Sequence, residues 1–173
     1  MIEVKLRSWR ISDLEDLVMY ANNWKIARNL TDQFPYPYTK KTGREFIAYA
    51  TGEGPNHIFA IEVDGQAVGG IGIHPLGDIF RKNAELGYWL AEDFWGKGII
   101  TRAIGQVVEF TFKNLDIDRI FARPFGSNMP SQRVLEKNGF VLEARFEGTI
   151  LKGDELQDEL LYALRRKDWN PDE

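Results

Sequence analysis

The sequence contains no cysteine and only two histidines, His57 and His74, among its 173 residues. The absence of cysteine excludes structural disulfides, thiolate metal sites and a covalent thioester intermediate on the protein. Two histidines do not favour a histidine-rich metal site. We therefore expect chemistry without a bound metal ion.

The sequence also lacks an excess of positive charge and a long apolar run. Lys and Arg number 22 against 26 Asp and Glu, which gives a net charge of −4. Binding to a phosphate backbone needs a basic face, so we expect no nucleic-acid partner, whereas amines are compatible partners. No apolar run reaches the roughly eighteen residues of a membrane span, and residues 1–5 do not resemble a signal peptide. We expect a cytoplasmic protein with no membrane partner.

What remains is the pattern of one globular domain over residues 1–173, with 43% hydrophobic and 13% aromatic residues. A capping box of Ser12 and Glu15 predicts a first helix, and Asp64-Gly65 predicts a β-hairpin. Further helices are predicted over 24–30 and 99–115. Another begins after Thr39 or Thr42 and runs through residue 50, and a last one begins at Asn128 or Ser131 and ends at Asn138-Gly139. Strands are predicted over 2–7, 57–63, 66–74, 83–91, 119–124, 140–145 and 157–164. Alternation along 83–91 puts one set of side chains on the face toward the core, namely Ala84, Leu86, Tyr88 and Leu90, and another on the opposite face, namely Glu85, Gly87 and Trp89. Strands that first meander and then alternate with helices imply an α/β sheet of mixed direction.

A strand that passes through a glycine turn into a helix is the most informative segment, and it ends in Trp95-Gly96-Lys97-Gly98-Ile99-Ile100-Thr101. The first N–H groups of a helix lack internal partners, and glycines allow a phosphate to approach them. Acids are usual in a first helical turn. Here none occurs between Asp93 and Glu109, while Lys97 and Arg102 flank the helix start. The segment therefore predicts a phosphate or pyrophosphate ligand.

Other interpretations of the glycine turn are possible. A P-loop would need Gly-x-x-x-x-Gly-Lys-Ser/Thr, which the sequence does not contain. A dinucleotide fingerprint would need a third glycine and a parallel βαβ unit. Taken alone, the turn is also compatible with a tight strand-to-helix connection that binds nothing.

Two motifs resemble signatures of the GNAT superfamily of acyl-CoA-dependent N-acyltransferases. The resemblance is closest to the RimJ/RimL-like branch, which includes ribosomal-protein N-terminal acetyltransferases. The first signature, Q/R-x-x-G-x-G/A, falls on residues 95–100, with Trp95 in place of a polar residue and Ile100 in place of a small one. The second, N-x-x-S-x-x-x-x-E-K-x-G-F, is met by Asn128, Ser131, Glu136, Lys137, Gly139 and Phe140.

This resemblance implies a single-domain GNAT fold, with a mixed, mostly antiparallel sheet of six to seven strands and about four helices. It implies acetyl-CoA as the acetyl donor, with its pyrophosphate on the glycine turn and its pantetheine arm along the preceding strand. The residues that would bind acetyl-CoA are Trp89, Leu90, Ala91, Trp95, Gly96, Lys97, Gly98, Ile99, Ile100, Thr101 and Asn128.

The resemblance also suggests two catalytic residues. Glu85 occupies a position where several GNAT enzymes carry a glutamate base, although a carboxylate satisfied by an ion pair explains it equally. Many members protonate the departing thiolate with a tyrosine four residues before the glycine of the second motif, but Leu135 stands there. Ser131 is the replacement candidate, and Asn128 would hold the pantetheine amide. Both residues are also ordinary helix caps.

The acceptor is predicted less closely than the donor. Phe34 and Tyr36 are candidates for its wall, or they belong to a loop that packs on the core. His74 is more readily a structural or solvated histidine than a base. We expect a primary amine, from a protein N-terminus, a polyamine or an aminoglycoside-like molecule, which attacks directly in a ternary complex of a monomer or homodimer. The rival hypothesis is a catalytically silent acyl-CoA-binding or regulatory module.

Overall fold

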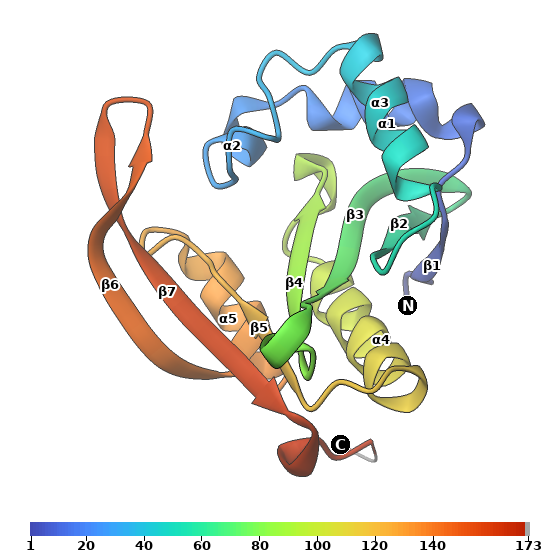
Figure 1. Cartoon of the computed structure of the whole chain (residues 1–173). Coiled ribbons are helices and arrows are strands. Elements are labelled where there is room, and N and C mark those ends of the chain that lie inside the picture. The colour runs from blue at the N-terminus through green and yellow to red at the C-terminus, as the bar shows by residue number, and fades with distance from the viewer. Residues whose placement is uncertain (172–173) are drawn as a thin grey trace.

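The computed structural model describes residues 1–171, and within them seven strands form one sheet in the order β1-β2-β3-β4-β5-β7-β6 (Figure 1). Only β4 and β5 run parallel, and every other neighbouring pair is antiparallel. The predicted mixed, mostly antiparallel α/β sheet is therefore confirmed. The strands are β1 (Lys5–Ser8), β2 (His57–Val63), β3 (Gln66–Pro75), β4 (Asn83–Leu90), β5 (Arg119–Ala122), β6 (Val141–Lys152) and β7 (Glu155–Arg165).

Five α-helices of the described chain cover the two faces of this sheet (Figure 1). They are α1 (Leu14–Ala21), α2 (Trp24–Ala27), α3 (Lys40–Ala50), α4 (Ile99–Asn114) and α5 (Met129–Lys137). All five were predicted from the sequence, one more than the family resemblance implies, and α2 is a single turn that ends at Ala27 instead of at residue 30. A hydrophobic cluster under α4 includes Ile71, Ile73, Leu86, Ile104 and Ile120, whereas a second, under α1 and α3, includes Trp9, Leu17, Ile47, Ala60 and Trp89.

Several predicted boundaries were wrong at the ends of the chain. The capping box of Ser12 and Glu15 is not used, because Asp13 accepts hydrogen bonds of 2.8 Å from both terminal nitrogens of Arg7 and from the Arg10 N–H, which fixes a 3-10 turn before α1. The strand predicted at 2–7 begins only at Lys5. Strand β6 continues well beyond its predicted end at residue 145, because it pairs with β7 up to Lys152, and β7 begins at Glu155 instead of at residue 157.

Strands β4 and β5 separate partway along β4, and the candidate site lies at this separation. Strand β5 pairs with β4 only over Asn83–Glu85, opposite Arg119–Phe121. From Leu86 onward one edge of β4 has no strand partner in the described sheet. The predicted alternation along β4 is confirmed: Ala84 and Leu86 pack in the cluster under α4, and Trp89 packs in the other.

We predict that Gly69→Ala destabilises the fold. A Cβ at Gly69 would stand 2.5 Å from the backbone oxygen of Trp89 and 3.2 Å from the Cα of Leu90, so the two strands would have to separate. We expect a loss of about 1–3 kcal/mol in the free energy of unfolding, measured by denaturant titration. The matched control is Gly77→Ala, because nothing lies within 4 Å of a Cβ there. Equal stability of the two variants would contradict the prediction.

Candidate functional site

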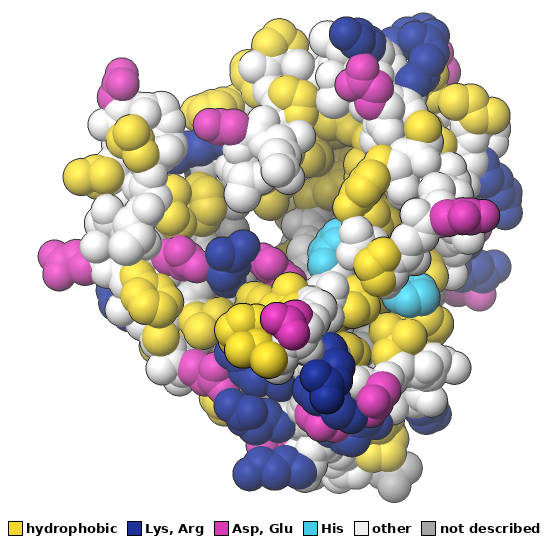
Figure 2. All heavy atoms as spheres, in the orientation of Figure 1, with side chains coloured by type: hydrophobic (Ala, Val, Ile, Leu, Met, Phe, Trp, Pro, Cys, Tyr) yellow, Lys and Arg dark blue, Asp and Glu magenta, His cyan; other side chains and the backbone are white. Residues whose placement is uncertain are grey.

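A cavity of about 540 Å³ lies where β4 and β5 separate. Figure 2 shows the face of the molecule hollowed at this place, with apolar side chains along much of its rim. Its wall comes from α3, β3, β4, β5, the start of α5 and the loop before α3. Five of the predicted site residues line it, namely Phe34, Glu85, Trp89, Asn128 and Ser131.

The glycine turn adopts a backbone that requires glycine. Gly96 and Gly98 both have φ of 72°, in the left-handed region, although nothing lies within 4 Å of a Cβ at either position. Glycine is therefore needed here for conformation and not for space. Gly98 ends the turn and α4 starts at Ile99, with no side-chain cap and no acid in the first turn. The buried Ile99 side chain anchors this start in the core.

The two cations predicted to flank the turn lie beside it. Lys97 Nζ donates to the Asp93 carbonyl at 2.7 Å, and Arg102 donates to the carbonyls of Gly98 and Lys97 at 3.3 Å. Thr101 and Ile100 follow Ile99 in the first turn of α4. The start of this helix therefore combines free N–H donors with nearby positive charge, which is an arrangement that suits an anion.

The end of β4 carries the remaining residues predicted to bind the donor. The Trp95 indole donates to the Leu90 carbonyl at 2.8 Å, which ties the turn to the strand, and Ala91 is buried. The Trp89 side chain points to the other side and meets the Phe34 ring at 5.6 Å between centroids. Only the backbone of Trp89 therefore lies along the open edge of β4.

The start of α5 brings Asn128 and Ser131 to the cavity. The Asn128 side chain caps the helix by accepting from the Ser131 N–H at 3.4 Å. The Ser131 hydroxyl lies 2.6 Å from the Tyr88 hydroxyl of β4. Burial raises the pKa of Tyr88 to about 12, and its hydrogen bond to Ser131 opposes part of that rise. The phenol therefore stays protonated at neutral pH.

Tyr88 is a site residue that the sequence analysis missed. The alternation of β4 placed it with the apolar side chains that face the core. A buried tyrosine in such a row still needs a hydrogen-bond partner for its hydroxyl group. This need was the sequence signal that could have marked Tyr88 as a site residue. Its partner lies 43 residues away in the chain, which the strand pattern alone does not reveal.

Glu85 forms the ion pair that the sequence analysis left open. Both of its oxygens accept from Arg123 of the chain after β5, at 2.9 and 3.2 Å, and Arg123 also lies 3.6 Å from Glu159. The Glu85 hydrogen bond raises the pKa of Arg123, against a smaller opposing effect of desolvation. Two carboxylates and one guanidinium leave the cluster with one net negative charge.

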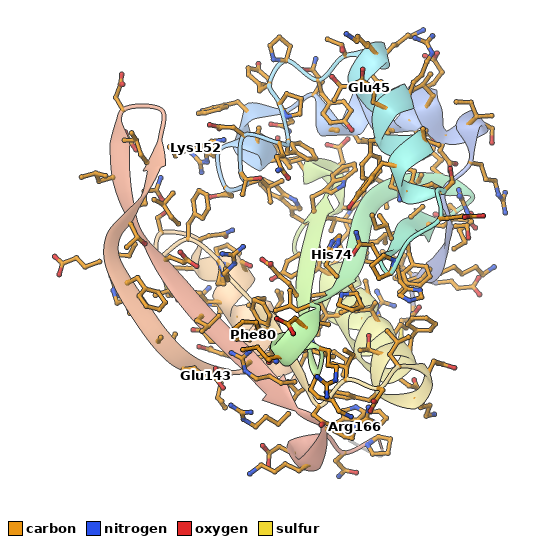
Figure 3. The ribbon with its side chains drawn as sticks, in the orientation of Figure 1. Glu45, His74, Phe80, Glu143, Lys152 and Arg166 are labelled. Atoms are coloured by element: carbon orange, nitrogen blue, oxygen red, sulfur yellow. The ribbon has the colours of Figure 1, made fainter. Side chains whose placement is uncertain are left out.

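His74 also lines the cavity, on β3 directly opposite Glu85 of β4. Figure 3 shows it near the middle of the molecule, beside β4. Burial lowers the pKa of His74 below its ordinary value of 6.5, although the charge of Glu85 works in the other direction. A Cβ at Gly72 would stand 2.9 Å from the His74 Nε2, so this glycine makes room for the imidazole.

The aromatic loop before α3 contributes unequally to the wall. Phe34 and Tyr38 line the cavity, and burial raises the pKa of Tyr38 to about 12. Tyr36, predicted to bind the acceptor, instead packs on Trp24 at 5.7 Å between ring centroids, outside the cavity lining.

The described residues contain neither a metal site nor a helix suited to a membrane. Residues 1–171 hold no group of three His, Cys, Asp or Glu side chains that suits a metal ion. Of the helices in that range, none has the length and apolar character needed to cross a membrane.

Comparisons with known proteins agree on one family. A family model described as "Acetyltransferase (GNAT) domain" matches residues 3–141. Over 106 residues the chain is 34% identical to a putative ribosomal N-acetyltransferase, YdaF, of Bacillus subtilis (strain 168), a match that covers 61% of this chain and 57% of YdaF. The chain thus spans little more than half the length of the first curated relatives it matches.

Two solved structures share the fold over nearly their whole length. The structure of RimL, a ribosomal L7/L12 alpha-N-protein acetyltransferase in complex with coenzyme A, has a TM-score of 0.83 and 22% identity and covers 94% of this chain and 93% of RimL. A spermidine N-acetyltransferase from Vibrio cholerae, in complex with CoA and spermine, has a TM-score of 0.82 and 20% identity, covering 95% of this chain and 96% of that enzyme. At these identities the likeness establishes the fold.

Proposed function

The chain belongs to the GNAT acetyltransferase family, and on this basis we propose that it transfers the acetyl group of acetyl-CoA to a primary amine held in the cavity. The observation that carries the proposal is the unpaired edge of β4, because it leads from the cavity beside Glu85 to Leu90, which the Trp95 indole ties to the glycine turn. The active unit would be one domain over residues 1–173, a cytoplasmic monomer or homodimer.

The residues present fit acetyl-CoA. Its pyrophosphate would accept from the free N–H groups of Gly98, Ile99, Ile100 and Thr101, at an uncapped helix start without acids. Gly96 and Lys97 would complete the turn, and Trp95 would fix its position against Leu90. The pantetheine amides would pair with the open backbone edge of β4 between Leu86 and Leu90, and Asn128 would hold the arm from the α5 side. Ala91, predicted to join them, already donates to the Val68 carbonyl and accepts from the Phe94 N–H.

The proposed reaction is a direct transfer. The neutral amine nitrogen attacks the thioester carbonyl carbon, so that a C–N bond forms while the C–S bond breaks. The amine loses one proton and the CoA thiolate takes one up. No cysteine is present to carry the acetyl group, so the amine and acetyl-CoA must be bound together.

Ser131 is the proposed hydrogen-bond donor that stabilises the departing thiolate, and the thiolate then takes its proton from solvent. A serine hydroxyl has one hydrogen, so Ser131 can donate to sulfur only if it is the acceptor in its contact with Tyr88. The protonated Tyr88 phenol, 2.6 Å away, can donate that bond. Tyr88 would therefore act as a positioning residue that turns the Ser131 hydrogen toward sulfur.

We expect Tyr88→Phe to lower kcat about tenfold while the KM for acetyl-CoA changes little. The loss should shrink with an acyl donor whose leaving thiol has a lower pKa, because that thiolate needs less stabilisation. Steady-state kinetics with two such donors measures the difference. A defect of the same size with both donors would mean that Tyr88 only supports the packing.

The walls favour an α-amine over a polyamine. The carboxylates that line the cavity are Glu45 and Glu85, and Glu85 is already paired with Arg123. A polyamine needs several unpaired carboxylates along its length. The N-terminal residue of a protein needs one negative charge for its ammonium group and apolar walls for its side chain. Apolar and aromatic side chains supply those walls, namely Leu30, Phe34, Tyr38, Phe46, Ile58 and Trp89. The net negative charge of the cluster of Glu85, Arg123 and Glu159 would attract the incoming ammonium group.

Release of free CoA tests the proposal. The protein is incubated with acetyl-CoA and a panel of amines: peptides with free N-termini, spermidine and an aminoglycoside. We expect thiol release that depends on the peptide. Tight acetyl-CoA binding with no release on any amine would instead support a silent acyl-CoA-binding module.

A further inference from the structure

A neutral imidazole without a hydrogen-bond partner faces the proposed acceptor cavity. Neither ring nitrogen of His74 makes a hydrogen bond to any side chain or backbone group of residues 1–171. Burial keeps this ring neutral near pH 7. The ring packs over Gly72, where a Cβ would stand 2.9 Å from Nε2, and His74 lines the cavity in which the acceptor would bind.

Glu85 is less suited to accept a proton directly. Arg123 engages both of its oxygens, and breaking a bidentate pair to protonate the carboxylate sacrifices two charge-assisted hydrogen bonds. The pair instead keeps Glu85 as a fixed negative charge opposite His74. Such a charge stabilises an imidazolium once it has formed.

We propose that His74, supported by Glu85, is the group that removes the proton from the acceptor amine. This inference rests on the proposed acetyl transfer. The ammonium N–H bond breaks and the proton passes to a ring nitrogen of His74, which leaves the amine lone pair free to attack the thioester. The imidazolium then faces the Glu85 carboxylate until solvent takes the proton. His74 is thus a catalytic residue and Glu85 a positioning residue.

Few ionisable side chains share the cavity with His74, so a change in its titration can be assigned to a particular neighbour. Besides Glu85 of β4 and Arg123 beyond β5, the ionisable side chains of the wall are Glu45 and Tyr49 of α3, Tyr38 of the preceding loop and Tyr88 of β4. Burial raises the pKa values of Tyr38 and Tyr88 to about 12, far from neutral pH.

The test is the pH dependence of kcat/KM for a peptide with a free N-terminus. In the unmodified protein, we expect a level profile between about pH 6.5 and the pKa of the α-amine near 8, because His74 accepts the proton throughout this range. His74→Gln should depend on the neutral amine present in solution. Its kcat/KM should be about tenfold lower at pH 7 and rise about tenfold per pH unit up to that pKa.

Two variants serve as controls. His57→Gln removes the other histidine, which packs edge-on against Phe110 at 5.3 Å outside the cavity lining, and should keep the level profile. Glu85→Gln should lower the whole profile without adding a slope. A level profile in His74→Gln, or a new slope in Glu85→Gln, would overturn the proposal.

An NMR titration keeps the proposal testable apart from activity. With two histidines in the chain, His74→Gln assigns the imidazole signals directly. We expect His74 to titrate below 6.5 and to shift to a lower pKa in Glu85→Gln. A His74 that is already charged at pH 7 would overturn the inference. Failure of the unmodified protein to release CoA with any amine would instead reject the proposed function.

Discussion

Gly98→Ala is expected to weaken acetyl-CoA binding at least about 100-fold, which corresponds to about 3 kcal/mol. An alanine at φ of 72° carries a backbone strain of about 1–2 kcal/mol, and the turn relieves this strain by moving. The N–H groups of Ile99 and Ile100 would then no longer converge on one anion. Isothermal titration calorimetry with acetyl-CoA measures the loss.

Gly65→Ala is the matched control for this variant. Gly65 lies in the turn between β2 and β3 with φ of 82°, and nothing lies within 4 Å of a Cβ there. It should therefore lose a similar amount of stability, about 1 kcal/mol, and bind acetyl-CoA normally. If both variants bind acetyl-CoA as the unmodified protein does, the pyrophosphate does not lie on the glycine turn.

Ser131→Ala should lower kcat at least about 100-fold while acetyl-CoA affinity changes less than about threefold. The departing thiolate loses its hydrogen-bond donor, and Tyr88 loses the partner at 2.6 Å through which it would act. The helix itself keeps its Asn128 cap, because that bond uses the Ser131 backbone N–H. Single-turnover kinetics separates the two quantities.

Ser127→Ala is the matched control for the serine. Ser127 lies just before α5, and its hydroxyl donates to Gln157 at 2.6 Å, outside the lining of the main cavity. We expect kcat within about twofold of the unmodified protein. If Ser131→Ala instead weakens acetyl-CoA binding and spares kcat, Ser131 belongs to the binding site and the thiolate is stabilised by another group.

Local sequence patterns predicted the parts of this protein that depend on neighbouring residues. The pair Asp64-Gly65 predicted the hairpin of β2 and β3 because Gly65 adopts a left-handed backbone. The spacing of Gly96 and Gly98 predicted the turn before α4 for the same reason. The alternation along β4 placed Glu85 and Tyr88 on opposite faces, and the structure agrees.

Contacts between distant segments could not be predicted in this way. Arg123 reaches Glu85 across 38 residues and forms the ion pair that the sequence left open beside a role as a base. His74 was favoured as a structural or solvated residue because its position at a strand end gave no sign of a cavity. Tyr36 and Tyr38 sit two residues apart in one loop, yet Tyr36 is 53% exposed and Tyr38 is 4% exposed. Only the packing of that loop determines which of the two tyrosines is buried.

The most direct test of the account is to locate the acetyl group after reaction with a peptide that carries both a free N-terminus and a lysine. Mass spectrometry of the peptide fragments is combined with a count of released CoA. We predict one acetyl group on the α-amine for each CoA released, because an α-amine with a pKa near 8 yields its proton far more readily than a lysine with a pKa of about 10.4. Acetyl-CoA that binds tightly and stays intact in the presence of the peptide would contradict the account.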